Sequence, residues 1–212
     1  MKSLPASALL ALALCVTALS FGYITFKSSD TSPLTLAPQS QTAQVSSTLG
    51  NGLISHWKFD EGSGSTVTSS VGGGTDTLGS PSWTTGKIGS ALSFNGSDYV
   101  NAGNISANQF TVSAWIRPTG SSGYGSVVMK QFAYGIETQG NTVYAGLGNG
   151  SAWVDGGGYL EGTISPNTWQ HVTQTFNGTN HRLYVNGVLV DSGSASASLA
   201  STRPLLIGAW GT

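Results

Sequence analysis

The chain has 212 residues, of which 39% are hydrophobic and only 8% are charged, and its formal net charge is −1. The Lys and Arg residues form no cluster, which excludes the basic surface that a nucleic-acid partner needs. The low charge and the 30 glycines favour an all-β protein with many tight turns over a helical bundle. The single cysteine, Cys15, lies in the N-terminal apolar segment, so we expect no disulfide in the folded part.

The N-terminal segment is a long apolar run between two lysines. Apolar residues extend from Leu4 to Phe26, with Lys2 before them and Lys27 after them. Two interpretations stay open: a signal peptide cleaved after Ser20, or an uncleaved membrane anchor formed by an apolar helix. Either one carries the rest of the chain out of the cytoplasm, to the cell surface or beyond. We therefore expect contact with a membrane only through this segment.

Residues 28–51 connect this segment, residues 1–27, to the rest of the chain. They are rich in Ser, Thr, Gln and Pro and show no hydrophobic periodicity. Such a stretch cannot bury enough apolar surface to fold, so we predict a disordered linker. The pattern changes at residue 52, and residues 52–212 are predicted to form one folded domain.

Short strands separated by turn signals follow from residue 52 onward. In FTVSAWIRP, Phe110, Val112, Ala114 and Ile116 alternate with residues of the other face, which is typical of a half-buried strand. Further strand-and-turn units are ALSFNGSDYVNAG, NTVYAGLGNG, NTWQHVTQTFNG and RPLLIGAWG. No segment after residue 27 has convincing helical periodicity. The sequence therefore predicts an antiparallel β-sandwich of the jelly-roll type.

The segment RLYVNGVLVDSG carries the clearest hairpin signal. Asn186-Gly187 predicts a two-residue type I′ turn, because both residues tolerate positive φ. The cross-strand partners in that register are Val185 and Val188, Leu183 and Val190, and Arg182 and Asp191.

The stretch LISHWKFDEGSGSTV opens the predicted domain. Its alternation predicts a strand over Leu53–Phe59 that ends at Asp60 and Glu61. The residues expected on the core side are Leu53, Trp57 and Phe59, and those expected on the outer side are His56, Lys58 and Asp60.

Five motifs together resemble the laminin-G-like, concanavalin A-like jelly-roll domains. GLISHWKFDEGSGSTV, GKIGSALSFNGSDYVNAG, FTVSAWIRP, NTWQHVTQTFNGTNHRLYVNGVLVDSG and LLIGAWG occur in the order and spacing of that family. The resemblance covers Gly52 to Thr212 and implies two curved sheets in an extracellular module that binds glycans or mediates adhesion. Family members usually continue into a closing strand beside the first one. We therefore expect a domain without that strand, with an unpaired edge over Leu53–Phe59.

The carboxylates and histidines give little support for catalysis. No two acidic residues repeat at a two-residue spacing on a strand, the arrangement that the resemblance would imply for a glucanase. No Ser-His-Asp or His-x-x-x-His spacing occurs either. His171 lies in a strand motif, WQHV, and His181 is expected in a turn. We therefore predict a protein that is not an enzyme, with a glycoside hydrolase domain as the third hypothesis.

Calcium is the metal that oxygen-rich loops suit best. The resemblance implies ligands in the loop at Gln131–Ala133 and after the LLIG strand, at Ala209 and Trp210. None of these residues is a carboxylate. Asp60 and Glu61 are the remaining candidates for a structural calcium site, and the alternative is that they only end the opening strand. No cofactor is required in either case.

Sugar binding needs exposed aromatic faces together with a few polar groups. The segment NTVYAGLGNGSAWVDGGGYLEG and the strand FTVSAWIRP supply the candidates, which are Tyr144, Trp153, Asp155, Tyr159 and Trp115. The opposing interpretation is that large aromatics in a sandwich form its core, which we favour for Trp57, Trp83 and Trp169.

The sequence thus predicts an exported module whose partner is a carbohydrate, such as a cell-surface glycan. The alternative is a structural spacer that contacts other surface proteins. Exposure separates the two, because burial of Trp115, Tyr144, Trp153 and Tyr159 together would remove the basis for sugar binding.

Overall fold

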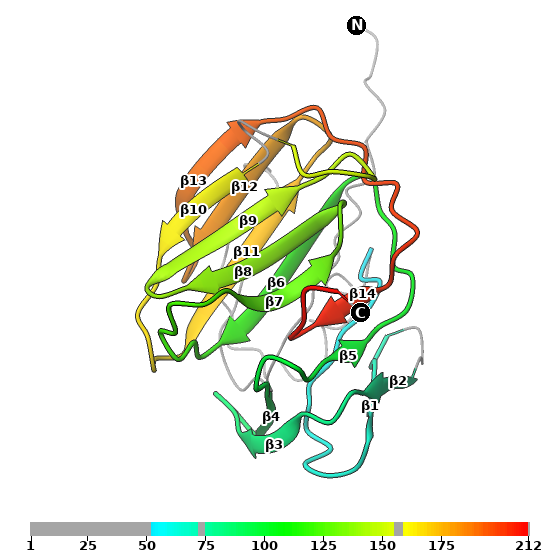
Figure 1. The fold of residues 1–212 in the computed structure, drawn as a ribbon, viewed down its shortest axis with the longest axis vertical. Helices are drawn as coiled ribbons and strands as arrows, with labels where there is room; N and C mark the ends of the chain where they lie inside the picture. Colours follow the sequence, from blue (N-terminus) through cyan, green and yellow to red (C-terminus); the bar gives the residue numbers. More distant parts are fainter. Residues whose placement is uncertain (1–51, 72–74, 155–158, 212) are drawn as a thin grey trace, which may run out of the picture.

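The computed structural model describes residues 52–71, 75–154 and 159–211 as a two-layered β-sandwich (Figure 1). The all-β, antiparallel architecture predicted from the sequence is confirmed. The described ranges contain no helix of the length and hydrophobicity that crossing a membrane requires. The expected N-terminal segment 1–27, the expected linker 28–51 and the candidate Asp155 lie outside these ranges.

The larger sheet has eight strands in the order β1-β2-β5-β14-β7-β8-β9-β10. Every neighbouring pair in it is antiparallel. Its strands are β1 (Thr66–Thr68), β2 (Thr75–Leu78), β5 (Val100–Asn101), β7 (Gly125–Lys130), β8 (Tyr134–Gln139), β9 (Thr142–Leu147), β10 (Tyr159–Thr163) and β14 (Leu205–Ile207).

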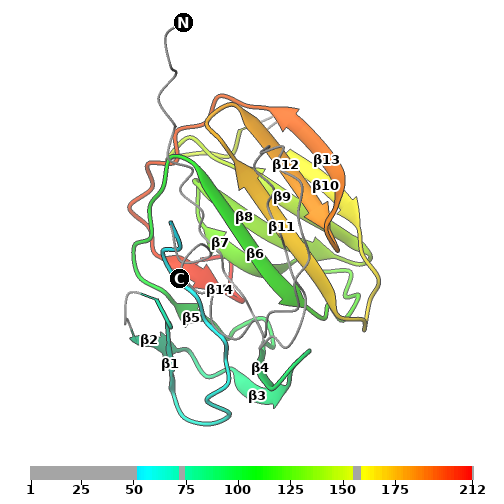
Figure 2. The same cartoon turned by 180° about the vertical axis from the view of Figure 1, so that it is seen from behind.

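The smaller sheet has four strands in the order β13-β12-β11-β6, and a separate two-stranded sheet joins β3 to β4. Figure 2 shows the four-stranded sheet in front of the larger one. These strands are β3 (Ser82–Thr85), β4 (Ser90–Ser93), β6 (Phe110–Ile116), β11 (Gln170–Phe176), β12 (Asn180–Val185) and β13 (Val188–Ser194).

The core lies between the two sheets because alternate residues of each strand point inward. On β6, the expected inward residues are all buried and the residues between them are half-buried, which confirms the alternation read from FTVSAWIRP. Phe110 of β6 stacks on Tyr134 of β8 with ring centroids 4.4 Å apart, so aromatic contacts join the two layers. Of the tryptophans expected in the core, Trp57 is buried, whereas Trp83 and Trp169 are half-buried.

The opening stretch does not form the expected strand over Leu53–Phe59. Trp57 makes one isolated bridge, to Ser69, and residues 53–59 belong to none of the strands of either sheet. Phe59 has a φ of 58°, in the left-handed region, so an extended backbone cannot continue past it. The predicted inward side is right for Trp57 and Phe59, which are both buried.

The β12–β13 hairpin has the predicted turn but not the whole predicted register. Asn186 and Gly187 have φ angles of 51° and 80°, and Val185 pairs with Val188 as expected. Beyond that pair a β-bulge inserts one extra residue, so Leu183 and Arg182 pair with Asp191 and Ser192. The expected pairs of Leu183 with Val190 and of Arg182 with Asp191 are therefore wrong.

The edge strands of the two sheets, β10 and β13, lie against each other next to the bulge. Asp191 of β13 accepts a hydrogen bond of 3.0 Å on Oδ2 from the backbone N–H of Glu161, on the edge strand β10. A side chain of the smaller sheet thus caps a donor at the edge of the larger sheet.

His181 lies on β12 and is fully buried, so its expected position in a turn is wrong. The turn comes before it, where Asn177 Oδ1 accepts hydrogen bonds from the N–H groups of Thr179 and Asn180. The His181 ring nitrogen Nε2 lies 2.9 Å from Nε2 of Gln174, which also donates to the carbonyl of Gly146 on β9. Buried polar contacts therefore join the smaller sheet to a backbone carbonyl of the larger sheet.

Candidate functional site

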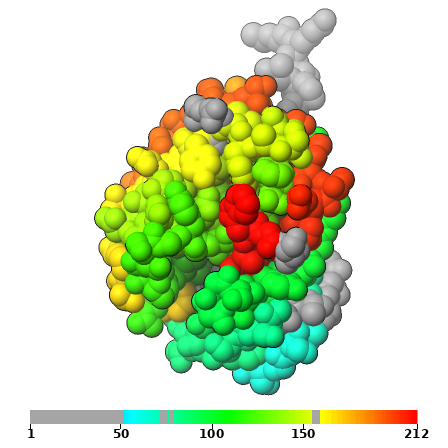
Figure 3. Space-filling view, viewed as in Figure 1, coloured from blue at the N-terminus to red at the C-terminus, as the bar shows by residue number. Residues whose placement is uncertain are grey.

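Three tyrosines gather on the outer face of the larger sheet. Tyr144 lies between the inward-facing Val143 and Ala145 of β9, so its side chain points away from the core. Its ring centroid is 6.0 Å from that of Tyr124 and 6.2 Å from that of Tyr159, with tilted ring planes. Figure 3 shows this face of the molecule, on which β7 to β10 appear in green to yellow.

Glu137 of β8 lies beside these tyrosines and is mostly buried, with 8% of its surface exposed. It is the cross-strand neighbour of Tyr144, and its Oε1 accepts a hydrogen bond of 2.7 Å from the Tyr159 hydroxyl. Burial raises the pKa of Tyr159, and the hydrogen bond to Glu137 and that carboxylate's charge raise it further. Tyr159 therefore remains a hydrogen-bond donor over the whole physiological pH range.

Trp153 continues the aromatic surface beyond Tyr159. Gly146 lies beneath both rings, because a Cβ atom at this position would lie 3.1 Å from the Trp153 ring and 3.2 Å from the Tyr159 ring. The other side of Trp153 packs edge-on against Phe132 at a centroid distance of 6.2 Å. We call Tyr124, Tyr144, Tyr159, Trp153 and Phe132 the aromatic strip.

The turn before Trp153 holds that side chain in place. Asn149 Oδ1 accepts hydrogen bonds from the N–H groups of Ser151 and Ala152, which folds the chain back on itself. Trp153 then forms a bridge to Gly148 at the end of β9. Local turn chemistry therefore places an aromatic residue from a glycine-rich loop on the strip.

The strip carries a carboxylate on each side of Tyr144, the second of its three tyrosines. Glu161 of β10 is the cross-strand neighbour of Tyr144 on the side opposite Glu137, and it is exposed. A cation lies at the far end of the strip, where the Arg203 guanidinium is 5.8 Å from the centroid of Phe132.

Trp115 lies on the outer face of the smaller sheet and not with the strip. Its indole is half-buried, the Lys87 ammonium lies 5.3 Å from its centroid, and the His171 ring lies 5.3 Å from it on the neighbouring strand. Burial lowers the pKa of His171. The structure therefore brings Tyr144, Trp153 and Tyr159 together and leaves Trp115 apart from them.

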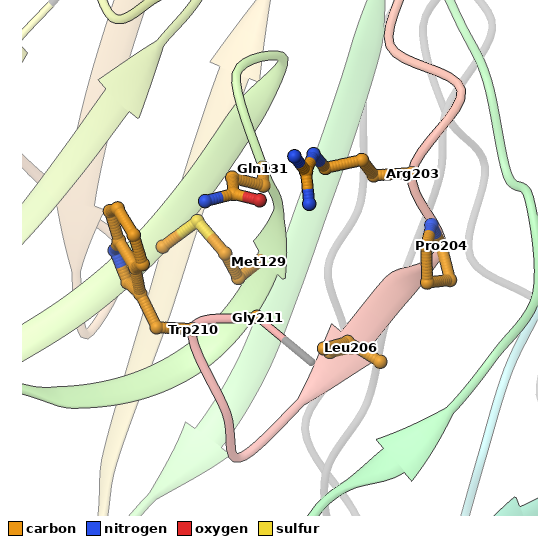
Figure 4. Close-up of a pocket in the computed structure, with 7 residues that line it drawn as sticks. All are labelled: Met129, Gln131, Arg203, Pro204, Leu206, Trp210 and Gly211. Atoms are coloured by element: carbon orange, nitrogen blue, oxygen red, sulfur yellow. The ribbon is translucent and has the colours of Figure 1, made fainter.

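Two hollows lie near the strip. The first holds about 20 Å³, little more than a water molecule needs, and is lined by residues of β7, of β14 and of the segments that flank them (Figure 4). Trp210 flanks this hollow beside Met129 and Gln131 (Figure 4). The second is an open groove of about 370 Å³ between β10 and β13, lined by Thr142, Glu161, Gly162, Thr163 and Val190.

Asp60 and Glu61 hold backbone amides of the protein. Glu61 Oε1 accepts a hydrogen bond of 2.9 Å from the N–H of Thr68, and Asp60 Oδ1 accepts one of 3.4 Å from the N–H of Ser90. Within the described ranges, no group of three or more Asp, Glu, His or Cys residues could hold a metal ion. These contacts give both carboxylates a structural role in this part of the chain. A structural calcium ion at this place stays a prediction.

Four residues of the site, Tyr124, Phe132, Glu137 and Glu161, were not among the sugar-binding candidates from the sequence. Tyr124 lies in the loop SSGYGS, where an aromatic residue between glycines was the available signal. Glu137 lies in YGIETQ, where the alternation of Tyr134, Ile136 and Thr138 would have placed it on the outer side of its strand. Their proximity to Tyr144 could not be foreseen, because it depends on which strands are neighbours in the sheet.

Residues 94–211, more than half of the chain, match the family model of the concanavalin A-like lectin/glucanases superfamily. The chain belongs to this superfamily. Domain 4 of AbnA, an extracellular arabinanase from Geobacillus stearothermophilus solved with arabinotriose, is 19% identical, with a TM-score of 0.52 over 68% of this chain and 79% of that one. The binding domain of botulinum neurotoxin DC, solved with SialylT, is 14% identical, with a TM-score of 0.58 over 76% of this chain and 44% of that one.

This member of the concanavalin A-like superfamily thus spans less than half of the toxin binding domain. At these identities the likeness shows the fold alone. No curated protein gives a significant match to the sequence.

Proposed function

We propose that this chain is an exported, non-catalytic carbohydrate-binding module that holds a glycan on the outer face of its larger sheet. The observation that carries the proposal is the aromatic strip, in which Tyr144, Tyr159 and Trp153 share one face above Gly146. Aromatic rings stack on the apolar faces of sugar rings, and the neighbouring polar groups bond the sugar hydroxyls.

The surroundings of the strip suit a sugar in two further ways. Gly146 has no side chain, so the sheet beneath Trp153 and Tyr159 leaves those rings room to lie flat. The exposed carboxylate of Glu161 can accept hydrogen bonds, which sugar hydroxyls donate. Two proteins of similar fold were solved with a bound glycan, arabinotriose in one and SialylT in the other, and this supports a glycan as the ligand here.

The N-terminal residues 1–27 support export, either as a signal peptide or as a membrane anchor. With the linker of residues 28–51, an anchored chain would hold the sandwich away from the cell surface. We propose adhesion to a surface glycan as the biological role in that case.

The test is the binding of the full chain to a panel of polysaccharides that includes neutral arabinans, glucans and galactans. The proposal predicts retention of the chain by at least one neutral polysaccharide. Uniform absence of binding would contradict it and would favour a structural module.

A second candidate function is protein interaction, and one observation favours it. Val188, Leu189 and Val190 follow one another on the edge strand β13 and are 64%, 48% and 40% exposed. Exposed apolar residues on a free sheet edge are typical of surfaces that pair with other proteins. Substitution of Leu189 by Lys would abolish such an interaction and leave binding to a glycan unchanged.

A hydrolase is the third candidate, and the geometry supports it least. A glycosidase needs two carboxyl groups placed across the scissile bond. Glu137 is mostly buried, and its carboxylate already accepts a hydrogen bond from the Tyr159 hydroxyl. The geometry therefore favours a structural role for Glu137 over a catalytic one. We therefore propose binding without hydrolysis. Release of reducing sugar from a bound polysaccharide, lost in Glu161→Gln, would show the opposite.

A further inference from the structure

We infer that the aromatic strip binds an uncharged glycan chain and rejects acidic sugars such as uronates, sialic acids and sulfated residues. The inference rests on the proposed function and adds the charge of the ligand to it. Its basis is the position of the two carboxylates that flank Tyr144, Glu137 on β8 and Glu161 on β10.

Both carboxylates lie directly beside the ring on which a sugar would stack. Tyr144 is the cross-strand partner of Glu137 on one side and of Glu161 on the other. Neighbouring strands are about 4.8 Å apart, so a sugar over Tyr144 has a carboxylate on each side at close range. A third negative charge placed between them would be repelled, and repulsion is strongest where the bound ligand excludes water.

No cation of the described ranges offsets these charges at the tyrosines. Lys87 lies over Trp115 on the other sheet, and Arg203 lies at the Phe132 end of the strip. Lys130 is fully buried and donates to Asn104 and to the carbonyl of Arg203. The others are Lys58 in the opening stretch, Arg117, which donates to the carbonyl of Asn167, and Arg182 on β12.

The order of the rings favours a chain over a single terminal sugar. Tyr124, Tyr144 and Tyr159 follow one another at 6.0 and 6.2 Å, and Trp153 and Phe132 extend the row. Several sugar units of an extended glycan would then contact the strip together, and the unit over Tyr144 would lie between the two carboxylates.

The experiment compares pairs of polysaccharides that share a backbone and differ in charge, using the full chain. The pairs are hydroxyethylcellulose with carboxymethylcellulose, and methyl-esterified with de-esterified polygalacturonan, together with neutral linear arabinan as a reference. We expect the acidic member of a pair to bind at least about tenfold more weakly at low ionic strength. The difference should shrink in about 1 M salt, where charges are screened within about 3 Å.

Two variants and a matched control test the residues themselves. Glu161→Gln and Glu137→Gln keep a hydrogen-bond acceptor but remove a charge, so each should raise binding of the acidic member severalfold. Glu61→Gln is the control, because Glu61 is exposed and bonds Thr68 away from the strip. Equal or tighter binding of the acidic members by the wild type would overturn the inference and leave the proposed function standing. Failure of every polysaccharide to bind would overturn both.

Discussion

The Tyr159 hydroxyl donates a hydrogen bond of 2.7 Å to Glu137 Oε1 across β9, the strand that lies between theirs in the sheet. Tyr159 is 43% exposed and Glu137 is 8% exposed, so the bond ties a surface ring to a mostly buried carboxylate. It fixes the ring over Gly146 at the middle of the aromatic strip.

Removal of that hydroxyl should destabilise the fold as well as the site. Tyr159→Phe leaves Glu137 without this donor, and an unsatisfied buried polar group costs about 1–3 kcal/mol. We expect the free energy of unfolding, measured with urea, to fall by that amount. Tyr124→Phe is the control, because Tyr124 is 64% exposed and should change stability by less than about 0.5 kcal/mol. Equal stability of both variants would show that the bond contributes nothing.

Gly146 is the position where a small change should affect binding more than folding. In Gly146→Ala the added Cβ would press on the rings of Trp153 and Tyr159, which must move by a few tenths of an ångström. We expect about tenfold weaker binding of a neutral polysaccharide and a stability loss of about 1 kcal/mol. Gly123→Ala is the control, since its Cβ would meet only Ser121 Oγ at 3.6 Å. If Gly146→Ala binds the polysaccharide as tightly as the wild type, the rings of Trp153 and Tyr159 do not contact the glycan.

Asp191 should protect the edge of the larger sheet. Asp191→Ala removes the acceptor for the N–H of Glu161 and leaves β10 with one more free donor at its edge. We expect a stability loss of about 1 kcal/mol and faster aggregation, followed by light scattering at several protein concentrations. Ser192→Ala, an exposed neighbour on β13, should behave as the wild type. Aggregation of the two variants at the same rate would contradict a capping role.

Stability should decrease between about pH 7 and pH 5.5. Burial lowers the pKa of His171, and burial followed by the charge of Lys58 lowers that of His56, both from an ordinary value of 6.5. Because each folded-state pKa lies below the unfolded value, the unfolded chain binds more protons as the pH falls through this window. The neutral imidazoles therefore stabilise the fold fully above the unfolded pKa and progressively less below it.

Urea unfolding at both pH values measures this effect. His171→Gln and His56→Gln should each reduce the pH dependence, whereas Ser192→Ala, which removes no titratable group, should not. A wild type that gains stability on acidification over this window would contradict the assignment.

Local patterns were sufficient to predict the sandwich but not the site. The alternation in FTVSAWIRP and the Asn186-Gly187 turn depend on neighbouring residues, and both were confirmed. The register beyond Tyr184 was wrong because a bulge adds one residue to β13, which the turn signal does not reveal. The opening strand was wrong because a strand needs a partner, and residues 53–59 make only the isolated bridge of Trp57 to Ser69 among the described residues.

The aromatic site was partly predictable, because some of its residues are close together in the sequence and others are not. Tyr144, Trp153 and Tyr159 come from one glycine-rich segment, so their composition alone made them candidates. Glu137 lies beside Tyr144 because β8 pairs with β9. Tyr124, in the loop before β7, lies beside Tyr144 through the ring contact between them. Trp115 had an equally suitable pattern, but its strand belongs to the other sheet.

The central claim is that a glycan lies on the outer face of the larger sheet, and one comparison tests it most directly. The variants Tyr144→Ala and Tyr184→Ala carry the same substitution on the outer faces of opposite sheets. Affinity electrophoresis measures how strongly each variant binds the neutral polysaccharide that the wild type binds. We predict at least about tenfold weaker binding for Tyr144→Ala and wild-type binding for Tyr184→Ala. Wild-type affinity of Tyr144→Ala, or an equal loss in both variants, would contradict the claim.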